Sequence, residues 1–250
     1  MGEKRDGKIA LVTGANRGLG FETARRLAKR GVKVLLGARS GESGKEAEAK
    51  LRGEGLEVEF ILLDVNDEKT RESAARYIEE KFGRLDILVN NAGVHLEGSA
   101  DFEIQASSQA PIEIYRKTFE TNFFNLIKVT QKLLPLVKKS DSGRIVNLSS
   151  ALDSSTLRSD PESFLYDFKI PAYDASKAAV NSFTAHLAYE LKDTPVKVKA
   201  AHPGWVKAET GAENTPMEIV DGVKAPVELA MLADDASGGK LRRQGEEPLW

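Results

Sequence analysis

Short apolar segments alternate along this chain with longer segments of helical period. Six of the apolar segments are rich in β-branched residues, as expected of strands, and several read as buried on both faces of a sheet: residues 9–13, 32–36, 58–63, 87–89, 144–148 and 196–201. Apolar side chains also recur at helical spacing between them: Phe21, Ala24, Leu27 and Ala28 form one stripe, and Ala74, Ile78 and Phe82 another.

Strands that alternate with helices build βαβ units with right-handed crossovers and a parallel sheet. We therefore expect an α/β fold, a Rossmann-type doubly wound parallel sheet of about seven strands with helices on both faces. Residues 1–250 contain no internal repeat and no low-complexity linker, so we predict a single domain. Segment 151–171 is rich in Ser, Asp and Pro, and we expect a long inserted loop there.

Composition and net charge limit the classes of binding partner that we expect. The formal net charge of −2 provides no field that would attract nucleic acid or an anionic membrane, so we expect neither as a partner. Residues 1–8 are polar and lack the apolar core of a secretory signal, and no run of ~18 apolar residues occurs, so we expect a cytoplasmic protein. The absence of cysteine excludes disulfides and thiolate chemistry, and the three histidines show no metal-site spacing, so no metal is expected.

A glycine-rich turn follows the first apolar segment and precedes a helix. The spacing of Gly14, Gly18 and Gly20 permits a tight turn and close backbone approach to a pyrophosphate, which the positive end of the next helix favours. The alternative is a βα turn that binds nothing. We predict a dinucleotide site whose residues in this turn are Gly14, Asn16, Arg17, Gly18, Leu19 and Gly20.

The end of the second apolar segment indicates which dinucleotide is bound. Folds that bind NAD usually place an acid there to hold the ribose hydroxyls, whereas this segment continues into Arg39 and reaches no acid before Glu42. A guanidinium at Arg39, with Arg17 as a second cation, suits the 2′-phosphate of NADP(H). Either arginine alone is by default a solvated surface charge, so the prediction rests on the two together and on the missing acid.

Polar and small residues follow the third and fourth apolar segments. Asp64, with Val65 beside it, is predicted to accept a hydrogen bond from the adenine amino group; the alternative is a helix cap, for which Asn66 or Asp67 is better placed. The fourth segment runs into residues 90–93, Asn-Asn-Ala-Gly. Asn91, Ala92 and Gly93 suit a cofactor lying across the sheet, although paired asparagines also occur in ordinary turns.

Candidate chemistry comes from the predicted helix 172–191. Tyr173 and Lys177 are four residues apart and share a face, where the lysine cation favours the phenolate and lowers the tyrosine pKa from about 10. Such a tyrosine can exchange a proton near neutral pH. The spacing alone is common and also fits a surface pair. Ser150 ends a predicted strand upstream, and Asn122 lies inside a predicted helix, where asparagine is unfavourable and needs a local explanation.

These motifs, in this order, resemble the short-chain dehydrogenase/reductase family, in its carbonyl-reductase-like branch. The resemblance runs from Lys8 to about Trp205 and implies one dinucleotide-binding and catalytic domain. It further implies that Tyr173 is the general acid in reduction, that Lys177 binds the nicotinamide ribose and tunes the tyrosine, that Ser150 rather than Ser149 bonds the substrate carbonyl, and that Asn122 holds a water linking Lys177 to solvent. It also implies that one segment passes under the nicotinamide: Pro203, Gly204, Trp205 and Val206.

The chain departs from the family pattern at three places. Ala208 stands where the family usually has a phosphate-contacting threonine, and Thr210 either replaces that contact or the contact is lost. Asn125 stands where the asparagine motif usually continues with glycine, which we interpret as a packing change.

The third departure is the length of the segment between Ser150 and Tyr173, which exceeds the family's usual length. By resemblance, this inserted substrate-side loop, 151–171, implies a monomer. Its apolar side chains either line a substrate pocket or pin the loop to the body: Phe164, Leu165, Tyr166 and Phe168. His95, just after the Asn-Asn-Ala-Gly motif, is a candidate to face the substrate.

The combined prediction is an NADPH-dependent reductase that converts an aldehyde or ketone to an alcohol, with a small-molecule carbonyl compound as its partner. Two alternatives remain: an NAD-linked alcohol dehydrogenase, and a non-catalytic protein that senses a dinucleotide. Arg17 and Arg39 argue against the first, and the complete set of Asn122, Ser150, Tyr173 and Lys177 argues against the second.

Overall fold

The computed structural model describes residues 7–98, 106–150, 159–163, 166, 169–204, 206, 217–232 and 241–242. Most of the inserted loop 151–171 lies outside these residues. So do six residues named above: Phe164, Leu165, Phe168, Trp205, Ala208 and Thr210.

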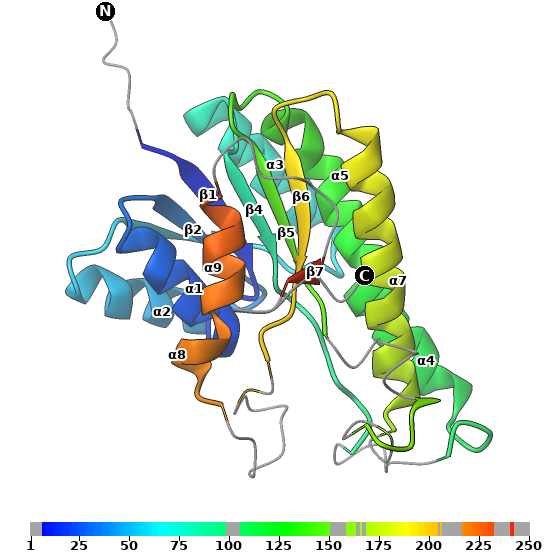
Figure 1. The fold of residues 1–250 in the computed structure, drawn as a ribbon. Coiled ribbons are helices and arrows are strands. Elements are labelled where there is room, and N and C mark those ends of the chain that lie inside the picture. The colour runs from blue at the N-terminus through cyan, green and yellow to red at the C-terminus, as the bar shows by residue number, and fades with distance from the viewer. Residues whose placement is uncertain are drawn as a thin grey trace, which may run out of the picture.

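A seven-stranded parallel sheet forms the centre of the molecule, in the order β3-β2-β1-β4-β5-β6-β7 (Figure 1). Its strands are β1 (Ile9–Thr13), β2 (Lys33–Ala38), β3 (Val58–Leu62), β4 (Ile87–Asn90), β5 (Arg144–Leu148), β6 (Lys197–Ala201) and β7 (Leu241–Arg242). All neighbours pair in parallel, which confirms the predicted doubly wound sheet. The two-residue strand β7 carries no readable hydrophobic period, and the sequence alone did not locate it.

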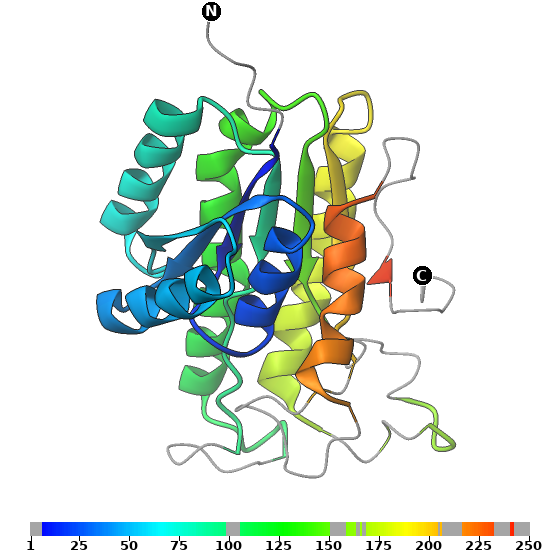
Figure 2. The same cartoon turned by 90° about the vertical axis from the view of Figure 1, so that its left-hand side faces the viewer.

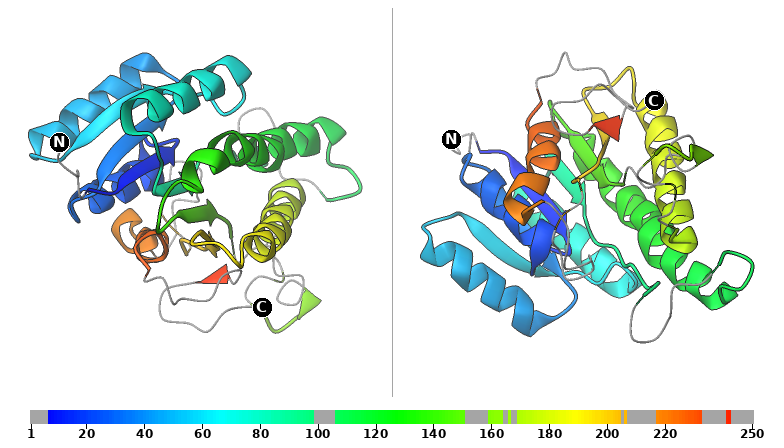
Figure 3. Two further views of the ribbon diagram at one scale, coloured as in Figure 1. Left: turned by 90° about the horizontal axis from the view of Figure 1, so that it is seen from above. Right: turned by 60° about the horizontal axis from the view of Figure 1, so that its bottom comes forward.

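Helices cover both faces of the sheet (Figure 3). One face packs against α1 (Gly18–Ala28), α2 (Gly41–Gly53) and α9 (Lys224–Ala230), and in Figure 2 the dark-blue α1 lies beside the orange α9. The other face packs against α3 (Glu68–Phe82), α5 (Asn125–Val137) and α7 (Pro171–Glu190). The described residues also include two short helices, α4 (Ile112–Phe119), which lies beside α7, and α8 (Ile219–Gly222), which lies beside α1.

Side-chain alternation explains the two cores. Alternate residues of β1 enter opposite faces: Ala10 and Val12 belong to the core on the α1 face, whereas Leu11 belongs to the core on the face of α3 and α5, and all three are fully buried. The stripes predicted for the helices are the buried ones, with Ala24 and Leu27 on α1 and Ile78 on α3.

Strand order reverses between β1 and β4, because the chain builds outward through β2 and β3 and then crosses back. In open parallel sheets of this kind, ligands bind at the carboxyl ends of the strands beside such a reversal. The fold therefore places the glycine turn after β1 and the Asn-Asn-Ala-Gly turn after β4 next to one another.

Strands β1 and β5 have the predicted bounds, and the boundaries of the other predicted strands and of α7 differ by one or two residues. Strand β2 extends to Ala38, and α7 begins at Pro171, so the inserted segment ends one residue earlier than predicted. Proline suits the first position of a helix because that position needs no backbone N–H donor. No helix among the described residues is long and apolar enough to cross a membrane.

Candidate active site

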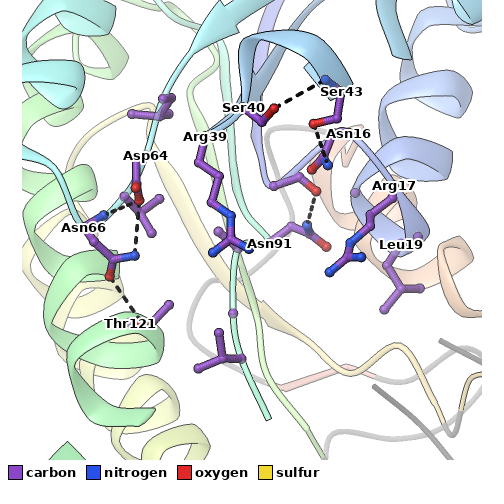
Figure 4. A pocket seen from close by; sticks show the side chains of 18 of the residues that line it. Asn16, Arg17, Leu19, Arg39, Ser40, Ser43, Asp64, Asn66, Asn91 and Thr121 are labelled. Atoms are coloured by element: carbon purple, nitrogen blue, oxygen red, sulfur yellow. Dashed lines mark hydrogen bonds between the residues drawn. The ribbon is translucent and has the colours of Figure 1, made fainter. Parts of the chain in front are cut away.

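A cavity of about 630 Å³ opens where the carboxyl ends of β1, β2, β3 and β4 meet (Figure 4). The volume is in the range of small-molecule and cofactor sites. Every residue predicted to bind the cofactor from the first four strand ends lines it: Gly14, Asn16, Arg17, Gly18, Leu19, Gly20, Arg39, Asp64, Val65, Asn91, Ala92 and Gly93. The structure thus brings these residues together.

The glycine turn is shaped by close backbone contact. Gly14 and Gly18 have φ values of +63° and +57°, in the left-handed region that only glycine enters without cost. A Cβ at Gly20 would collide with the Gly14 carbonyl oxygen and with the Asn91 side-chain amide. The space that a side chain would fill at Gly20 is therefore taken by the neighbouring turn, which draws the first turn of α1 against the end of β4.

Thr13 holds the Asn-Asn-Ala-Gly turn against β1. Its hydroxyl oxygen accepts hydrogen bonds from the backbone N–H groups of Asn91 at 3.0 Å and Ala92 at 2.9 Å. The Asn91 side chain in turn donates to the Thr13 carbonyl at 2.8 Å. The first asparagine of the motif, Asn90, is buried and donates to Asn147 on β5 at 2.8 Å. The two asparagines therefore hold three strand ends in register.

Two cations extend into the cavity. Figure 4 shows the side chains of Arg39 and Arg17 reaching in from the ends of β2 and β1, with Asn91 between them in that view. Ser40, directly after Arg39, caps α2 by accepting from the Ser43 N–H at 3.5 Å. Arg39 is thus followed by a serine that caps α2, and no acid stands at the end of β2.

Hydrogen bonds that the sequence did not predict hold the side chain of Asp64 in place. The Asp64 carboxylate accepts from the backbone and side-chain N–H groups of Asn66 at 2.9 and 3.1 Å, and Asn66 accepts from Thr121 at 3.1 Å. Asn125 also donates to Asn66, at 2.8 Å, so the departure that we interpreted as packing makes a hydrogen bond. Asp67 caps α3, as expected, which leaves Asp64 outside that role.

The helix around Asn122 is distorted, which explains how an asparagine is accommodated inside a helical segment. Residues Glu120–Phe124 form a π-helical turn between α4 and α5. The fully buried Asn122 side chain accepts from the Val94 N–H at 2.7 Å and donates to the Val94 carbonyl at 2.9 Å. It also donates to the Ser176 hydroxyl of α7 at 3.1 Å. Asn122 therefore joins α7 to the segment that follows β4.

Tyr173 and Lys177 face the same junction. The buried Lys177 amine donates to the Leu148 carbonyl at the end of β5 at 2.7 Å and lies 5.6 Å from the centre of the Tyr173 ring. A Cβ built on Gly93 would lie 3.2 Å from the Asn122 Oδ1 and 3.8 Å from the Lys177 Nζ. The cavity residue Gly93 thus connects the cofactor turn to the Tyr–Lys pair.

Both serines that follow β5 are buried. The Ser149 hydroxyl donates to the Lys177 carbonyl at 3.3 Å, so it is engaged with the α7 backbone. Ser150 is 5% exposed. The structure therefore gives Ser149 a structural role.

Of the segment after β6, the structure describes Pro203, Gly204 and Val206. A Cβ on Gly222 of α8 would meet the Pro203 carbonyl, the Val206 side chain and, at 3.3 Å, the side chain of Leu19. Helix α8 therefore packs against both this segment and Leu19, a residue that lines the cavity.

Sequence reasoning missed several side chains that line the cavity, among them Ser43 and Thr121. Ser43 accepts a hydrogen bond from the predicted site residue Asn16 at 3.2 Å, and Thr121 directly precedes Asn122 in the chain.

His95, predicted as a candidate to face the substrate, lines the cavity, and its ring lies 5.3 Å from the Tyr173 ring. Tyr166 is 39% exposed. Among the described residues, no group of three histidine or acidic side chains is placed to hold a metal ion.

The family model described as short chain dehydrogenase matches residues 8–219. The chain belongs to the short-chain dehydrogenase family. It is 34% identical to (+)-neomenthol dehydrogenase of Arabidopsis thaliana, over 90% of this chain and 92% of that protein. It is 31% identical to carbonyl reductase (NADPH) 1 of Mus musculus, over 92% of this chain and 93% of that protein.

Among solved structures, salutaridine reductase from Papaver somniferum superposes with a TM-score of 0.79 at 29% identity, covering 94% of this chain and 99% of that one. The chain is therefore a short-chain dehydrogenase family oxidoreductase with carbonyl-reductase-like relatives, and its cofactor class is a nicotinamide dinucleotide.

Proposed function

We propose that the protein reduces an aldehyde or ketone to an alcohol with NADPH, and that Tyr173 is the general acid. The observation that carries the proposal is the junction at Gly93. One side of it faces the buried Lys177 amine beside Tyr173, and the other side opens on the cavity that Arg17 and Arg39 enter. The two arginines would then bind the cofactor phosphate at one end of the site, and Tyr173 would transfer the proton at the other.

The residues present fit a dinucleotide. A side chain at Gly18 would meet nothing within 4 Å, so the backbone there is open to a diphosphate at the first turn of α1, where helix N–H groups and the helix dipole favour an anion. The guanidinium groups of Arg39 and Arg17 suit the 2′-phosphate that distinguishes NADP(H) from NAD(H). When bound, the nicotinamide would supply a hydride to the carbonyl carbon.

The protein's own residues orient the carbonyl and move the proton. Tyr173 donates its phenolic proton to the carbonyl oxygen, and Lys177 stabilises the resulting phenolate by charge. Ser150 donates a hydrogen bond to the same oxygen; its neighbour Ser149 already bonds the α7 backbone. Asn122 fixes the segment after β4 through Val94 and, by resemblance to the family, would hold a water that links Lys177 to solvent.

The names of two relatives support the class of reaction. One is a carbonyl reductase named for NADPH, and the other a dehydrogenase of the cyclic alcohol neomenthol. Both point to a small carbonyl compound and its alcohol as the substrate pair. Pro203, Gly204, Trp205 and Val206 would pass under the nicotinamide, by the same resemblance.

Steady-state assays of the purified chain test the proposal. Aliphatic, aromatic and cyclic aldehydes and ketones are supplied with NADPH or with NADH, and nucleotide oxidation is followed at 340 nm. We expect turnover of at least one carbonyl class and a kcat/KM for NADPH above that for NADH. A preference for NAD in the oxidative direction would instead identify an alcohol dehydrogenase. Tight NADPH binding without turnover of any compound would identify a sensor.

We also propose a monomeric cytoplasmic protein; the monomer rests on the inserted segment, residues 151–170, which directly precedes α7. Light scattering coupled to gel filtration should then give a mass near 27.3 kDa. A mass of twice that value would contradict the monomer.

A further inference from the structure

The carboxylate of Glu97 connects the cofactor turn to the first turn of the helix that carries Tyr173. Glu97 is 4% exposed and lies 75 and 76 residues before the two backbone groups that it contacts. One carboxylate oxygen accepts from the Ala172 N–H at 2.6 Å, and the other accepts from the Tyr173 N–H at 3.2 Å. Both contacts are made across the site rather than within the helix.

Helix α7 has no acceptor of its own for the backbone N–H groups of Ala172 and Tyr173. The first N–H groups of a helix have no partner inside it, and residue Ile170 at the cap position has no polar side chain. Pro171 has no N–H, the N–H of Asp174 bonds the Ile170 carbonyl, and the Asp174 carboxylate accepts from the Ile170 N–H at 3.3 Å. The donors of Ala172 and Tyr173 remain, and Glu97 accepts from both.

The segment from Asn91 to Glu97 is therefore fastened at three points. Asn91 is held by Thr13, Val94 is held by Asn122, and Glu97 is held by the start of α7. The first two attachments fix the segment relative to the cofactor cavity, and the third fixes the backbone of the tyrosine relative to the segment. A negative charge also suits the positive end of the helix.

Resting on the function proposed above, we infer that Glu97 is a positioning residue for the reaction, which sets the place of Tyr173 relative to the bound dinucleotide. A purely structural role would lower stability without a selective effect on the chemical step. Positioning predicts a loss confined to kcat, because displacement of a reacting group by about 1 Å can reduce a rate by about a hundredfold.

The chain offers a matched control in Asp86. This carboxylate is also buried, at 5% exposure, and accepts a backbone N–H from another element, that of Ile9 at 2.8 Å. It lies before β4, at the amino-terminal edge of the sheet, whereas Tyr173 faces the carboxyl edge. Asp86→Asn therefore removes a comparable buried charge away from the site.

The experiment compares Glu97→Gln, Glu97→Ala and Asp86→Asn with the unaltered protein, measuring Tm, the Kd for NADPH, and kcat. We expect kcat to fall about tenfold in Glu97→Gln, which keeps one acceptor, and further in Glu97→Ala. The Kd for NADPH should stay within about twofold in both. Asp86→Asn should lower Tm and leave kcat unchanged. An unchanged kcat in Glu97→Ala, or equal losses of kcat and NADPH affinity, would overturn the inference.

A second readout does not depend on turnover. The ring resonances of Tyr173, assigned by their loss in Tyr173→Phe, should shift in Glu97→Gln with NADP⁺ bound and stay in place in Asp86→Asn. If the unaltered protein reduces no carbonyl compound, the proposed function fails, and this comparison still tests Glu97. Resonances that stay in place in Glu97→Gln would overturn the positioning role.

Discussion

Replacing Arg39 by aspartate tests the cofactor preference through one side chain. Arg39 extends into the cavity at the end of β2, and the residue after it is Ser40 rather than an acid (Figure 4). The substitution removes a guanidinium suited to a 2′-phosphate and introduces the acid that would hold a ribose hydroxyl in an NAD site. NADPH and NADH should therefore respond in opposite directions.

The magnitude follows from the exposure of Arg39. Hydrogen bonds to charged groups contribute about 1.5–3 kcal/mol. Because Arg39 is exposed, water and salt screen the interaction, and about 1–2 kcal/mol is appropriate. That corresponds to an increase of about 5- to 30-fold in the Kd for NADPH, with Arg17 retaining part of the charge recognition. Repulsion between the new carboxylate and the phosphate adds to the loss.

Isothermal titration with each nucleotide, at low and high salt, measures the effect. Arg30→Asp is the control, since Arg30 is also exposed but follows the far end of α1 from the glycine turn. We expect NADPH binding to weaken only in Arg39→Asp, less so at high salt, and NADH binding to hold or improve. Equal weakening for both nucleotides, or no change for NADPH, would refute the charge argument.

Two further predictions concern stability. Thr13→Val keeps the shape of the side chain but leaves the Ala92 N–H without its acceptor, so the free energy of unfolding should fall by about 1–3 kcal/mol. Thermal denaturation should show a Tm lower by several degrees, and an unchanged Tm would contradict the role assigned to Thr13. Partial burial of Glu59 raises its pKa, but hydrogen bonds from Lys81 and Tyr77 outweigh this and lower its pKa below the ordinary value of 4.5. Its stabilising contribution is therefore present above pH 4.5 and lost as the pH falls through the lowered pKa; acid unfolding of Glu59→Gln should show a weaker pH dependence there, and an identical profile would contradict it.

The sequence predicted the sheet well because buried parallel strands are continuous apolar runs. Residues 9–13 and 144–148 were located to the residue, since polar or glycine-rich segments bound them on both sides. The two residues of β7 could not be found, because a strand that short has no periodicity. Helix α7 was placed within one residue at each end.

The sequence predicted those parts of the site that lie at the carboxyl ends of strands. Parallel strands bring their carboxyl ends to one edge, so Gly14, Arg39, Asp64 and Asn91 were expected to meet there, and they line one cavity. The π-helical turn at Asn122 could not be predicted, because it depends on bonds to Val94 and Ser176 from two other elements.

Glu97 shows the same limit more sharply. A single acid in a loop belongs to no recognisable motif. Its role follows only from the tertiary structure, in which it accepts hydrogen bonds from two N–H groups at the start of α7. Asn125 was read as a packing change for a similar reason, since its partner Asn66 lies 59 residues away in sequence. Long-range polar contacts are set by the tertiary fold, and local sequence does not record them.

The most direct test of the central claim is hydride transfer in Tyr173→Phe. The substitution keeps the ring, and with it the packing beside His95 and Lys177, but removes the phenolic proton. Stopped-flow measurement of NADPH oxidation by the best carbonyl substrate should show NADPH still bound and the transfer rate reduced by about 10²–10⁴-fold, the usual contribution of general acid catalysis. A transfer rate equal to that of the unaltered protein would contradict the account.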